Sequence, residues 1–331
     1  MEHSTGPGVF TVSLDFELYW GVRDVRTLES YRENLLGEYR AIPEMLSLFE
    51  AYQIHCTWAT VGFLFFESKD DLQRSIPARL PQYADSSLNP YQCLESIGPT
   101  AEDDPFHFAP DLIRKIQSTR HQEIGTHTFS HYYCLEPGQT RETFRDDLLA
   151  ALDVASRYGI RLTSIVFPRN QYNGDYLDVC QQLGLTVYRG NPDSWIYGGR
   201  AGAQESRLRR GLRLLDSYLN LTGPQVHSPE RLKGQRPFNV PASRFLRPYQ
   251  PGPAFLERLR LRRICDELSA AATQGALYHL WWHPHNFGKH LPENIDFLRR
   301  ILGHYAGLRE RHQMTSLNMG ELPHHWPLET A

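Results

Sequence analysis

Short apolar segments alternate with longer amphipathic segments along almost the whole chain, and this alternation limits the folds open to it. A strand is expected at 8–16 (GVFTVSLDF), and a helix at 27–51, where apolar residues recur at helical spacing. The same order repeats down the chain, which is typical of a parallel sheet. Since six or seven such units favour a barrel over an open sheet, we predict an α/β protein built as a (β/α) barrel.

The other expected elements follow the same order. Further strands are expected in apolar runs at 54–65, 122–128, 163–168, 185–190, 276–283 and 314–318. Further helices are expected at 109–119, 139–158, 174–183, 202–219, 254–274 and 291–311. Two stretches depart from the pattern: 68–107, interpreted as a long insertion, and 222–253, which is rich in proline and irregular. We expect a single domain that spans 1–331.

The composition excludes several classes of protein. A formal net charge of −3 over 331 residues gives no global basic field, so no nucleic-acid partner is expected. The first residues lack a basic region followed by an apolar stretch, and no run approaches the length of a membrane span, so we expect neither a signal peptide nor a transmembrane segment. The five cysteines are scattered and form no CxxC pair, which predicts reduced thiols and a cytoplasmic protein.

Ionisable residues gather where the predicted strands end. Ligands of parallel α/β folds bind at the carboxyl ends of the strands, so these residues are expected to converge on one rim. They lie in the short stretches Asp15–Glu17, His127–His131, Phe167–Asn170, Asp193–Trp195 and Trp282–His285. An Asp, a Glu, several His and an Arg on one rim indicate the site of a metal-dependent hydrolase.

Two of these histidines, His127 and His131, have the spacing of neighbours on one helical turn. Thr128 stands where the zincin motif HExxH has its Glu, so the pair is not a zincin site. Two His with one carboxylate leave a position open for water, as catalytic zinc sites do. Such pairs also cap, pair and stack in ordinary structures, and the spacing alone leaves both interpretations open.

Asp15 and Glu17 lie two apart on a strand, so both side chains are expected on one face, with Phe16 in the packing. Two carboxylates on one face repel each other unless a cation lies between them. A metal on Glu17 and a guanidinium near Asp15 would remove the repulsion. An Asp at a strand end also commonly accepts hydrogen bonds from loop amides, which is the simpler alternative for Asp15.

Taken together, the motifs SLDFE, HTFSH, FPRN, DSW and WWHPH resemble, in order, those of the polysaccharide deacetylases, the NodB-like family 4 carbohydrate esterases. The resemblance extends from Thr11 to about His285. It implies a distorted (β/α) barrel of seven or eight strands. It also implies a divalent metal, most often Zn²⁺ with Ni²⁺, Co²⁺ and Mn²⁺ as alternatives, that serves to remove an acyl group from an amino sugar.

The resemblance also implies roles for individual residues. The expected metal ligands are Glu17, His127 and His131. The expected catalytic residues are Asp15 as base, Arg169 as its partner, His283 as acid and Asp193, which orients that acid. The expected substrate-binding residues are Trp195, Tyr132, Asn170 and His285, together with Trp20, which lies near a strand end where an aromatic face could stack on a sugar. A backbone N–H near Tyr132 or Tyr133 is expected to stabilise the oxyanion.

The chain departs from the family pattern at three points. Asp-Phe-Glu replaces the more common pair of adjacent aspartates, and Arg169 follows a proline instead of preceding one. His285 competes with His283 for the role of acid, since either could reach the rim.

The resulting hypothesis is a metal-dependent N-deacetylase of a cytoplasmic glycan precursor, nucleotide-linked or lipid-linked. The alternatives are a hydrolase of a small non-sugar amide and a degenerate barrel that binds glycan without turnover. The basic segment 207–221 could contact lipid phosphate at a membrane surface, or it is an outer barrel helix with a solvated face. The sequence indicates no oligomeric state.

Overall fold

A computed structural model describes residues 6–192, 207–232 and 236–326. In this part of the chain the strands form one sheet in the order β6-β5-β4-β3-β2-β1-β8-β7, with β9 beside β1. Each of these neighbouring pairs is parallel. The strands are β1 (Val9–Phe16), β2 (Cys56–Thr60), β3 (Gln122–Thr126), β4 (Ser164–Ile165), β5 (Val187–Gly190), β6 (Phe238–Pro241), β7 (Arg244–Phe245), β8 (Leu277–Trp282) and β9 (Thr315–Ser316).

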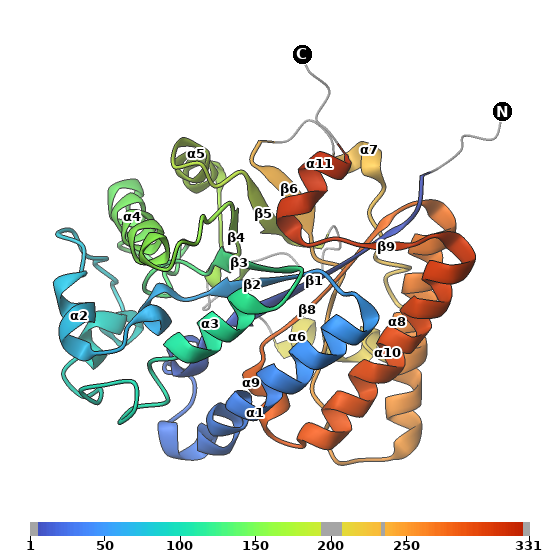
Figure 1. Ribbon diagram of the computed structural model, residues 1–331, viewed down its shortest axis with the longest axis horizontal. Helices are drawn as coiled ribbons and strands as arrows, with labels where there is room; N and C mark the ends of the chain where they lie inside the picture. The colour runs from blue at the N-terminus through green and yellow to red at the C-terminus, as the bar shows by residue number, and fades with distance from the viewer. Residues whose placement is uncertain (1–5, 193–206, 233–235, 327–331) are drawn as a thin grey trace.

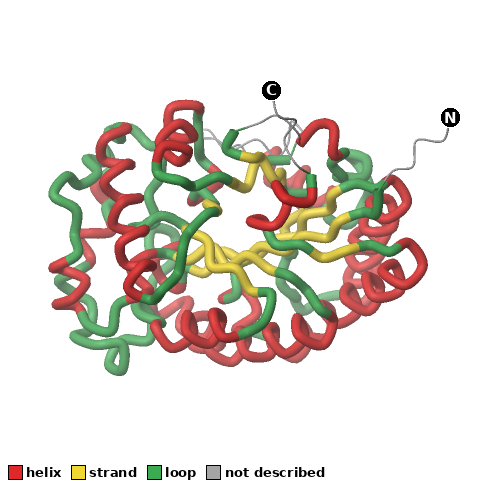
Figure 2. The backbone as a smooth tube through the Cα atoms, turned by 45° about the horizontal axis from the view of Figure 1, so that its top comes forward, coloured by secondary structure: helices red, strands yellow, loops and turns green. Residues whose placement is uncertain are grey.

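The segment 238–245 links the two ends of the sheet. Its first half is β6, which pairs with β5, and its second half is β7, which pairs with β8. Between them, Ala242 N donates to Gly190 O at 2.9 Å and Ser243 N donates to His279 O at 2.8 Å. The sheet therefore curves back on itself, and the predicted distorted barrel is confirmed. Figure 2 shows the strands at the centre and the helices around them.

The helices cover the outside of the sheet (Figure 1). The longer ones are α1 (Leu28–Tyr52), α3 (Pro110–Ser118), α4 (Arg141–Arg157), α5 (Gly174–Gln182), α6 (Arg207–Asp216), α8 (Ala254–Gln274) and α10 (Leu291–His312). The short ones are α2 (Lys69–Arg74), α7 (Pro229–Leu232), α9 (His285–Gly288) and α11 (Leu322–His325). The helix predicted at 254–274 coincides with α8, and the other long helices overlap the predicted ranges. The first part of the range 202–219 lies outside the described residues.

Strands β6 and β7 were not expected, because they lie in the proline-rich stretch 222–253. Proline has no N–H for a ladder and is found mainly at strand ends or edges. Pro241 is the last residue of β6, so the strand ends at the residue that has no N–H to donate to the ladder. A four-residue strand and a two-residue strand are too short for the alternation of side chains to be recognised in the sequence.

Strand β1 lies in the middle of the sheet, and every residue of it is buried. Phe16 belongs to the main hydrophobic core, as predicted from its position between Asp15 and Glu17. The barrel interior beneath the site is polar. His279 of β8 hydrogen-bonds through Nε2 to Ser13 Oγ at 2.8 Å and through Nδ1 to Val240 O at 3.3 Å.

The predicted insertion 68–107 has little regular structure beyond α2 and short 3₁₀ turns. An antiparallel bridge between Ser68 and Thr100 joins its two ends. The insertion also bonds to the barrel rim, because the Tyr83 hydroxyl accepts from Tyr133 N at 2.9 Å and Trp20 Nε1 donates to His107 O at 2.9 Å. It therefore packs beside the strand ends that carry the predicted site.

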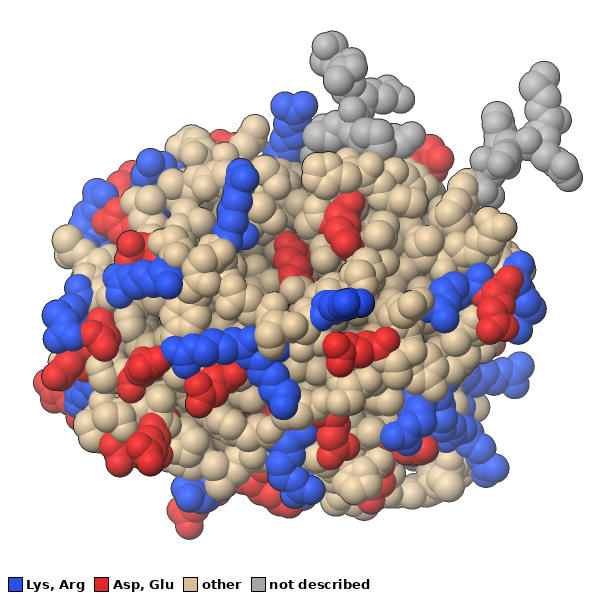
Figure 3. Space-filling model, viewed as in Figure 1, with Lys and Arg blue, Asp and Glu red and all other residues tan. Residues whose placement is uncertain are grey.

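The surface in Figure 3 carries basic and acidic side chains interspersed over the whole visible face. All five cysteines are free thiols. Among the described helices, none has both the length and the apolar character of a membrane span.

The buried His279 predicts a specific pH dependence of stability. Burial lowers the pKa of His279 from 6.5 to about 3, with the Arg189 charge acting in the same direction. The folded protein therefore keeps His279 neutral at a pH where the unfolded chain would bind a proton. The stability that this neutral form contributes is fully present above 6.5, the pKa in the unfolded chain. It is lost as the pH falls from 6.5 towards about 3, the pKa in the folded protein. One such group changes the free energy of unfolding by at most about 1.4 kcal/mol per pH unit.

Urea unfolding of the wild type and of His279→Gln between about pH 7 and pH 5 measures this effect. The variant should lose stability less steeply with falling pH. His312→Gln, which removes an exposed histidine of α10, is the matched control and should keep the wild-type slope. Equal slopes for His279→Gln and the wild type would show that His279 does not resist protonation.

Candidate active site

The centre of the site is the carboxylate of Glu17, which directly follows β1 and is buried. Four imidazole Nε2 atoms surround it. Those of His131 and His127 lie 3.1 and 3.3 Å from Oε2, and those of His285 and His283 lie 3.2 and 3.6 Å from Oε1. Burial raises the pKa of the Glu17 carboxyl, but the charge of His283 and the bonds to the other three imidazoles outweigh it and hold the pKa well below its usual range.

Gly21 makes room for this carboxylate. A Cβ built on Gly21 would lie 1.9 Å from Cδ of Glu17 and 2.0 Å from Oε1. Gly21 ends a 3₁₀ turn that follows β1, and this turn brings its backbone over the Glu17 side chain. The turn therefore needs glycine at this position for Glu17 to reach the histidines.

His127 directly follows β3 and extends its ladder, since His127 N donates to Thr60 O at 2.9 Å. Its Nδ1 lies 2.8 Å from Val166 O. A carbonyl can only accept, so Nδ1 carries the hydrogen, and in the neutral ring the Nε2 lone pair faces Glu17. His127 is thus oriented as a metal ligand.

The loop from His127 to His131 is not a helical turn, although the spacing of the two histidines fits one. Thr128 and His131 have φ values of 65° and 59°, in the left-handed region. Thr128 Oγ1 accepts from Tyr132 N at 2.7 Å, which closes the loop. The two imidazole rings still converge, with centroids 5.0 Å apart, because the loop folds back instead of winding forward.

Asp147 of α4 holds this loop from behind. Its carboxylate accepts from Phe129 N at 2.7 Å, from Ser130 N at 3.2 Å and from the Ser130 hydroxyl. Burial raises the pKa of Asp147 to about 7, although these hydrogen bonds lower it. Thr128 and Ser130 therefore both shape this loop, and Asp147 is the partner of Ser130 that the sequence did not reveal.

Asp15 pairs with Arg189 of β5, and the prediction that Arg169 is its partner is wrong. Arg189 donates to both carboxylate oxygens, at 2.6 Å to Oδ1 and 2.7 Å to Oδ2. Its guanidinium lies 4.1 Å from the Trp281 ring and also bonds to Ser13 Oγ at 3.1 Å. Burial raises the pKa of Asp15, but the charge and hydrogen bonds of Arg189, together with the nearby histidines His127 and His283, outweigh it and lower the pKa overall.

Arg169 instead bonds to Asp24 and lies 3.4 Å from Glu136 Oε1, with its guanidinium 4.1 Å from the Tyr133 ring. Both Arg169 and Asn170 have positive φ, and this tight turn aims the Arg169 side chain at Asp24.

Asn170 was expected to bind substrate, but its Oδ1 accepts from Arg189 Nη2 at 3.0 Å. It therefore helps to hold the partner of Asp15.

Two other expected substrate contacts are also wrong in this structure. Trp20 is fully buried in the main core, so it cannot wall a sugar site. Tyr132 is buried too, with its hydroxyl 2.7 Å from Thr143 Oγ1. The Tyr132 and Tyr133 amides donate to Thr128 Oγ1 and to the Tyr83 hydroxyl, so neither is available for an oxyanion. Asp193 and Trp195 lie outside the described residues.

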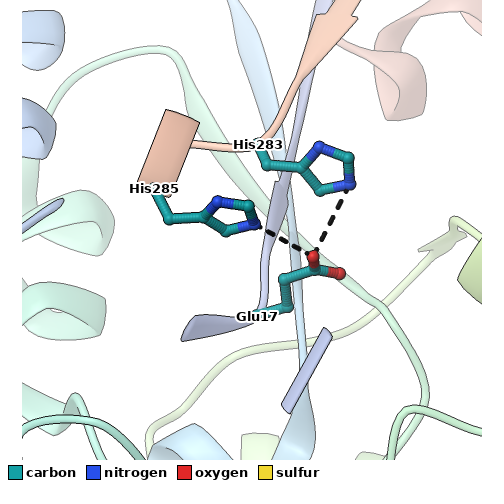
Figure 4. Close-up of side chains that lie close together, drawn as sticks. All are labelled: Glu17, His283 and His285. Atoms are coloured by element: carbon teal, nitrogen blue, oxygen red, sulfur yellow. Dashed lines mark hydrogen bonds and ion pairs between the residues drawn. The ribbon is translucent and has the colours of Figure 1, made fainter. Parts of the chain in front are cut away.

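His283 and His285 approach the same oxygen of Glu17 (Figure 4). His283 follows β8, and its side chain is 24% exposed, whereas the side chain of His285 at the start of α9 is 3% exposed. Burial lowers the pKa of His283 to about 4, although the Glu17 and Asp15 charges raise it. Of the two, His283 is the one that a substrate can reach.

The residues present fit a divalent cation. Two triads share Glu17: one with His127 and His131, the other with His283 and His285, and within each triad the ligand atoms lie within 4.8 Å of one another. A buried carboxylate with imidazole nitrogens is a donor set that suits zinc and similar ions.

Comparisons with known proteins confirm the fold and the resemblance. Residues 37–188 match the family model of the polysaccharide deacetylases. A candidate polysaccharide deacetylase from Mycobacterium smegmatis superposes with a TM-score of 0.61 at 14% identity, over 98% of this chain and 92% of that one. A candidate polysaccharide deacetylase from Pseudomonas aeruginosa PAO1 and Puue allantoinase each give a TM-score of 0.53 at 13% identity, over 96% of this chain and 89% of theirs. No curated protein matches the sequence.

The role of Gly21 can be tested by Gly21→Ala. The added methyl group would overlap the Glu17 carboxyl group and push it from the histidines, so the affinity for Zn²⁺ should fall at least ~10-fold, the lower range for lost support of a ligand. Competition with a chelating dye measures the affinity. Gly303→Ala, at a helical position with open space around it, is the control and should bind as the wild type does. Unchanged affinity in Gly21→Ala would remove Glu17 from the ligand set.

Proposed function

We propose that this chain, which matches the polysaccharide deacetylase family over residues 37–188, is a metal-dependent hydrolase that removes an N-acetyl or other N-acyl group from an amino sugar. The observation that carries the proposal is the buried Glu17 carboxylate among four imidazoles, beside an Asp15 held by Arg189. Such an arrangement combines a cation site with a base that is fixed and ionised.

In the proposed reaction, water adds to the acyl carbon, the C–N bond breaks, and a carboxylic acid and a free amine result. Glu17, His127 and His131 would hold the cation. The chemistry that a divalent cation supplies in such a site is Lewis acidity, which polarises a carbonyl and makes water more acidic.

Asp15 is the proposed base. Its lowered pKa keeps it ionised at neutral pH, and each carboxylate oxygen has a second lone pair besides the one that Arg189 uses. The two-pronged bond to Arg189 fixes the direction of the carboxylate. Arg189 is itself held by Ser13 and the Trp281 ring, so the base is positioned by a rigid and buried group.

His283 is the proposed acid. Its pKa of about 4 makes the imidazole neutral at neutral pH, so it has to gain a proton before it can donate one. Its Nε2 lies 3.8 Å from Asp15 Oδ2. At this separation one water molecule can bridge the two groups, so that the proton that Asp15 takes from water passes to His283 and then to the leaving amine.

The proposed substrate is a cytoplasmic glycan precursor, nucleotide-linked or lipid-linked, and the basic segment 207–221 is the proposed peripheral contact with a membrane. The second candidate is a small non-sugar amide. Its support is the shared fold of an allantoinase, which shows that the same barrel is used outside the deacetylases. A barrel without turnover is disfavoured, because a base, Asp15, and an acid, His283, both lie beside the proposed ligand set of Glu17.

Acetate release tests the proposed function. Nucleotide-linked and lipid-linked N-acetylhexosamines should yield acetate and free amine, and a chelator should stop the reaction until Zn²⁺ is restored. Asp15→Asn should keep the bound metal and lose turnover by ~100-fold or more, as expected when a general base is removed. Metal analysis and an acetate assay measure the two effects. Full activity of Asp15→Asn, or hydrolysis of ureides in place of N-acetyl sugars, would contradict this proposal.

Asp15 pairs with Arg189 and not with Arg169, and this difference gives a second test. Arg189→Lys keeps the charge but loses the two-pronged geometry, so kcat should fall ~10- to 100-fold at similar thermal stability. Arg169→Lys is the matched control and should stay within ~3-fold of the wild type, because Arg169 contacts neither Asp15 nor Glu17 by hydrogen bond. A larger loss in Arg169→Lys than in Arg189→Lys would restore Arg169 as the partner of the base.

A further inference from the structure

We propose that the site binds a second divalent cation, held by Glu17 Oε1, His283 and His285, and that this second ion inhibits the enzyme. The inference goes beyond the proposed function in the number of ions. It rests on that function only for the inhibition, since the binding itself requires no turnover.

The two oxygens of Glu17 face different pairs of histidines. Oε2 has His127 and His131 as neighbours at 3.3 and 3.1 Å, and Oε1 has His283 and His285 at 3.6 and 3.2 Å. Figure 4 shows both rings of the second pair with Nε2 directed at the same oxygen. A carboxylate that presents one oxygen to each of two ligand pairs has the arrangement of a bridge between two ions, which in two-metal sites lie ~3.5–4 Å apart.

His285 is held in position as a ligand should be. Its Nδ1 lies 2.8 Å from the Tyr31 hydroxyl, which fixes the ring and directs Nε2 at Glu17. Its backbone carbonyl accepts from Asn34 Nδ2 at 3.1 Å. The helix that begins at His285 lies against α1 so closely that a Cβ on Gly37 would come within 2.1 Å of Gly288 O. These contacts fix His285 beside Glu17, as the support of a metal ligand requires.

The second ion should bind more weakly than the first. The first pair is fully buried, and the bond from His127 Nδ1 to Val166 O strengthens that ligand. In the second pair, His283 is partly exposed, and the single negative charge of Glu17 is already shared. Excess cation would therefore fill the second position after the first.

Occupation of the second position removes the proposed acid. A lone pair of His283 Nε2 that binds an ion cannot carry a proton to the leaving amine. Activity should then rise with the first equivalent of Zn²⁺ and fall with the second.

Metal stoichiometry tests the proposal on the full chain. The chelator-stripped protein is dialysed against increasing Zn²⁺ and the bound metal is measured by mass spectrometry. The wild type should bind two ions per chain, and His285→Ala and His127→Ala should each bind one. His285→Gln serves if the alanine variant does not fold. His312→Ala, which removes an exposed histidine, is the control and should still bind two.

A magnetic readout checks that the two ions share a ligand. With Mn²⁺ in both positions, the wild type should give the signal of an exchange-coupled pair, and His285→Ala should give that of an isolated ion. Tyr31→Phe should weaken the second ion by ~10-fold and leave the first unchanged, because the Tyr31 hydroxyl bonds to His285 and Asn286 and to neither histidine of the first pair.

Three results would overturn the inference. The wild type could bind one ion at saturation; His285→Ala could still bind two; or His285→Ala could weaken a single ion, which would make His285 a further ligand of the first site. If two ions bind but no N-acyl sugar is cleaved, the proposed function fails and the second site stands. If N-acyl sugars are cleaved and excess Zn²⁺ leaves the rate unchanged, the inhibition is refuted.

Discussion

The site depends on the cost of burying the Glu17 carboxylate at the mouth of the barrel. A buried charge is costly unless donors or cations surround it. The imidazole of His127 is a poor donor to Glu17, because in its neutral form its hydrogen is already on Nδ1, at Val166 O. The lone pair of its Nε2 then faces a lone pair of Glu17 Oε2 at 3.3 Å, and the two repel each other. A metal cation between Glu17 and the imidazoles, as proposed, would remove this conflict at His127.

The barrel explains how residues far apart in the sequence meet at this carboxylate. Glu17, His127 and His283 each directly follow a strand, β1, β3 and β8, at the carboxyl ends of a parallel sheet. The segment 238–245 joins the ends of that sheet and encloses the interior beneath the site. Arg189 and His279 fill this interior and meet at Ser13 Oγ, so the base and the barrel core share one polar network.

The sequence predicted the alternating elements, the rim and the residues around Glu17, because strand ends and ordered motifs leave strong local signals. It did not reveal the partner of Asp15. Arg189 was recognised only as part of an apolar strand, although a charged residue in a buried strand needs a partner and is a signal in itself. The direction of Arg169 depends on a left-handed turn, and the burial of Trp20 on the packing of the insertion, and neither is readable from local pattern.

The glutamate at position 17, which departs from the common aspartate, now has a structural explanation. Its extra methylene carries the carboxylate farther from β1, to a point between two histidine pairs, and Gly21 supplies the space that the longer side chain occupies. An aspartate would hold its oxygens closer to the strand and could not serve both pairs equally. Glu17, Gly21 and His285 therefore form one unit: the longer ligand requires the glycine, and its reach gives the additional histidine a partner.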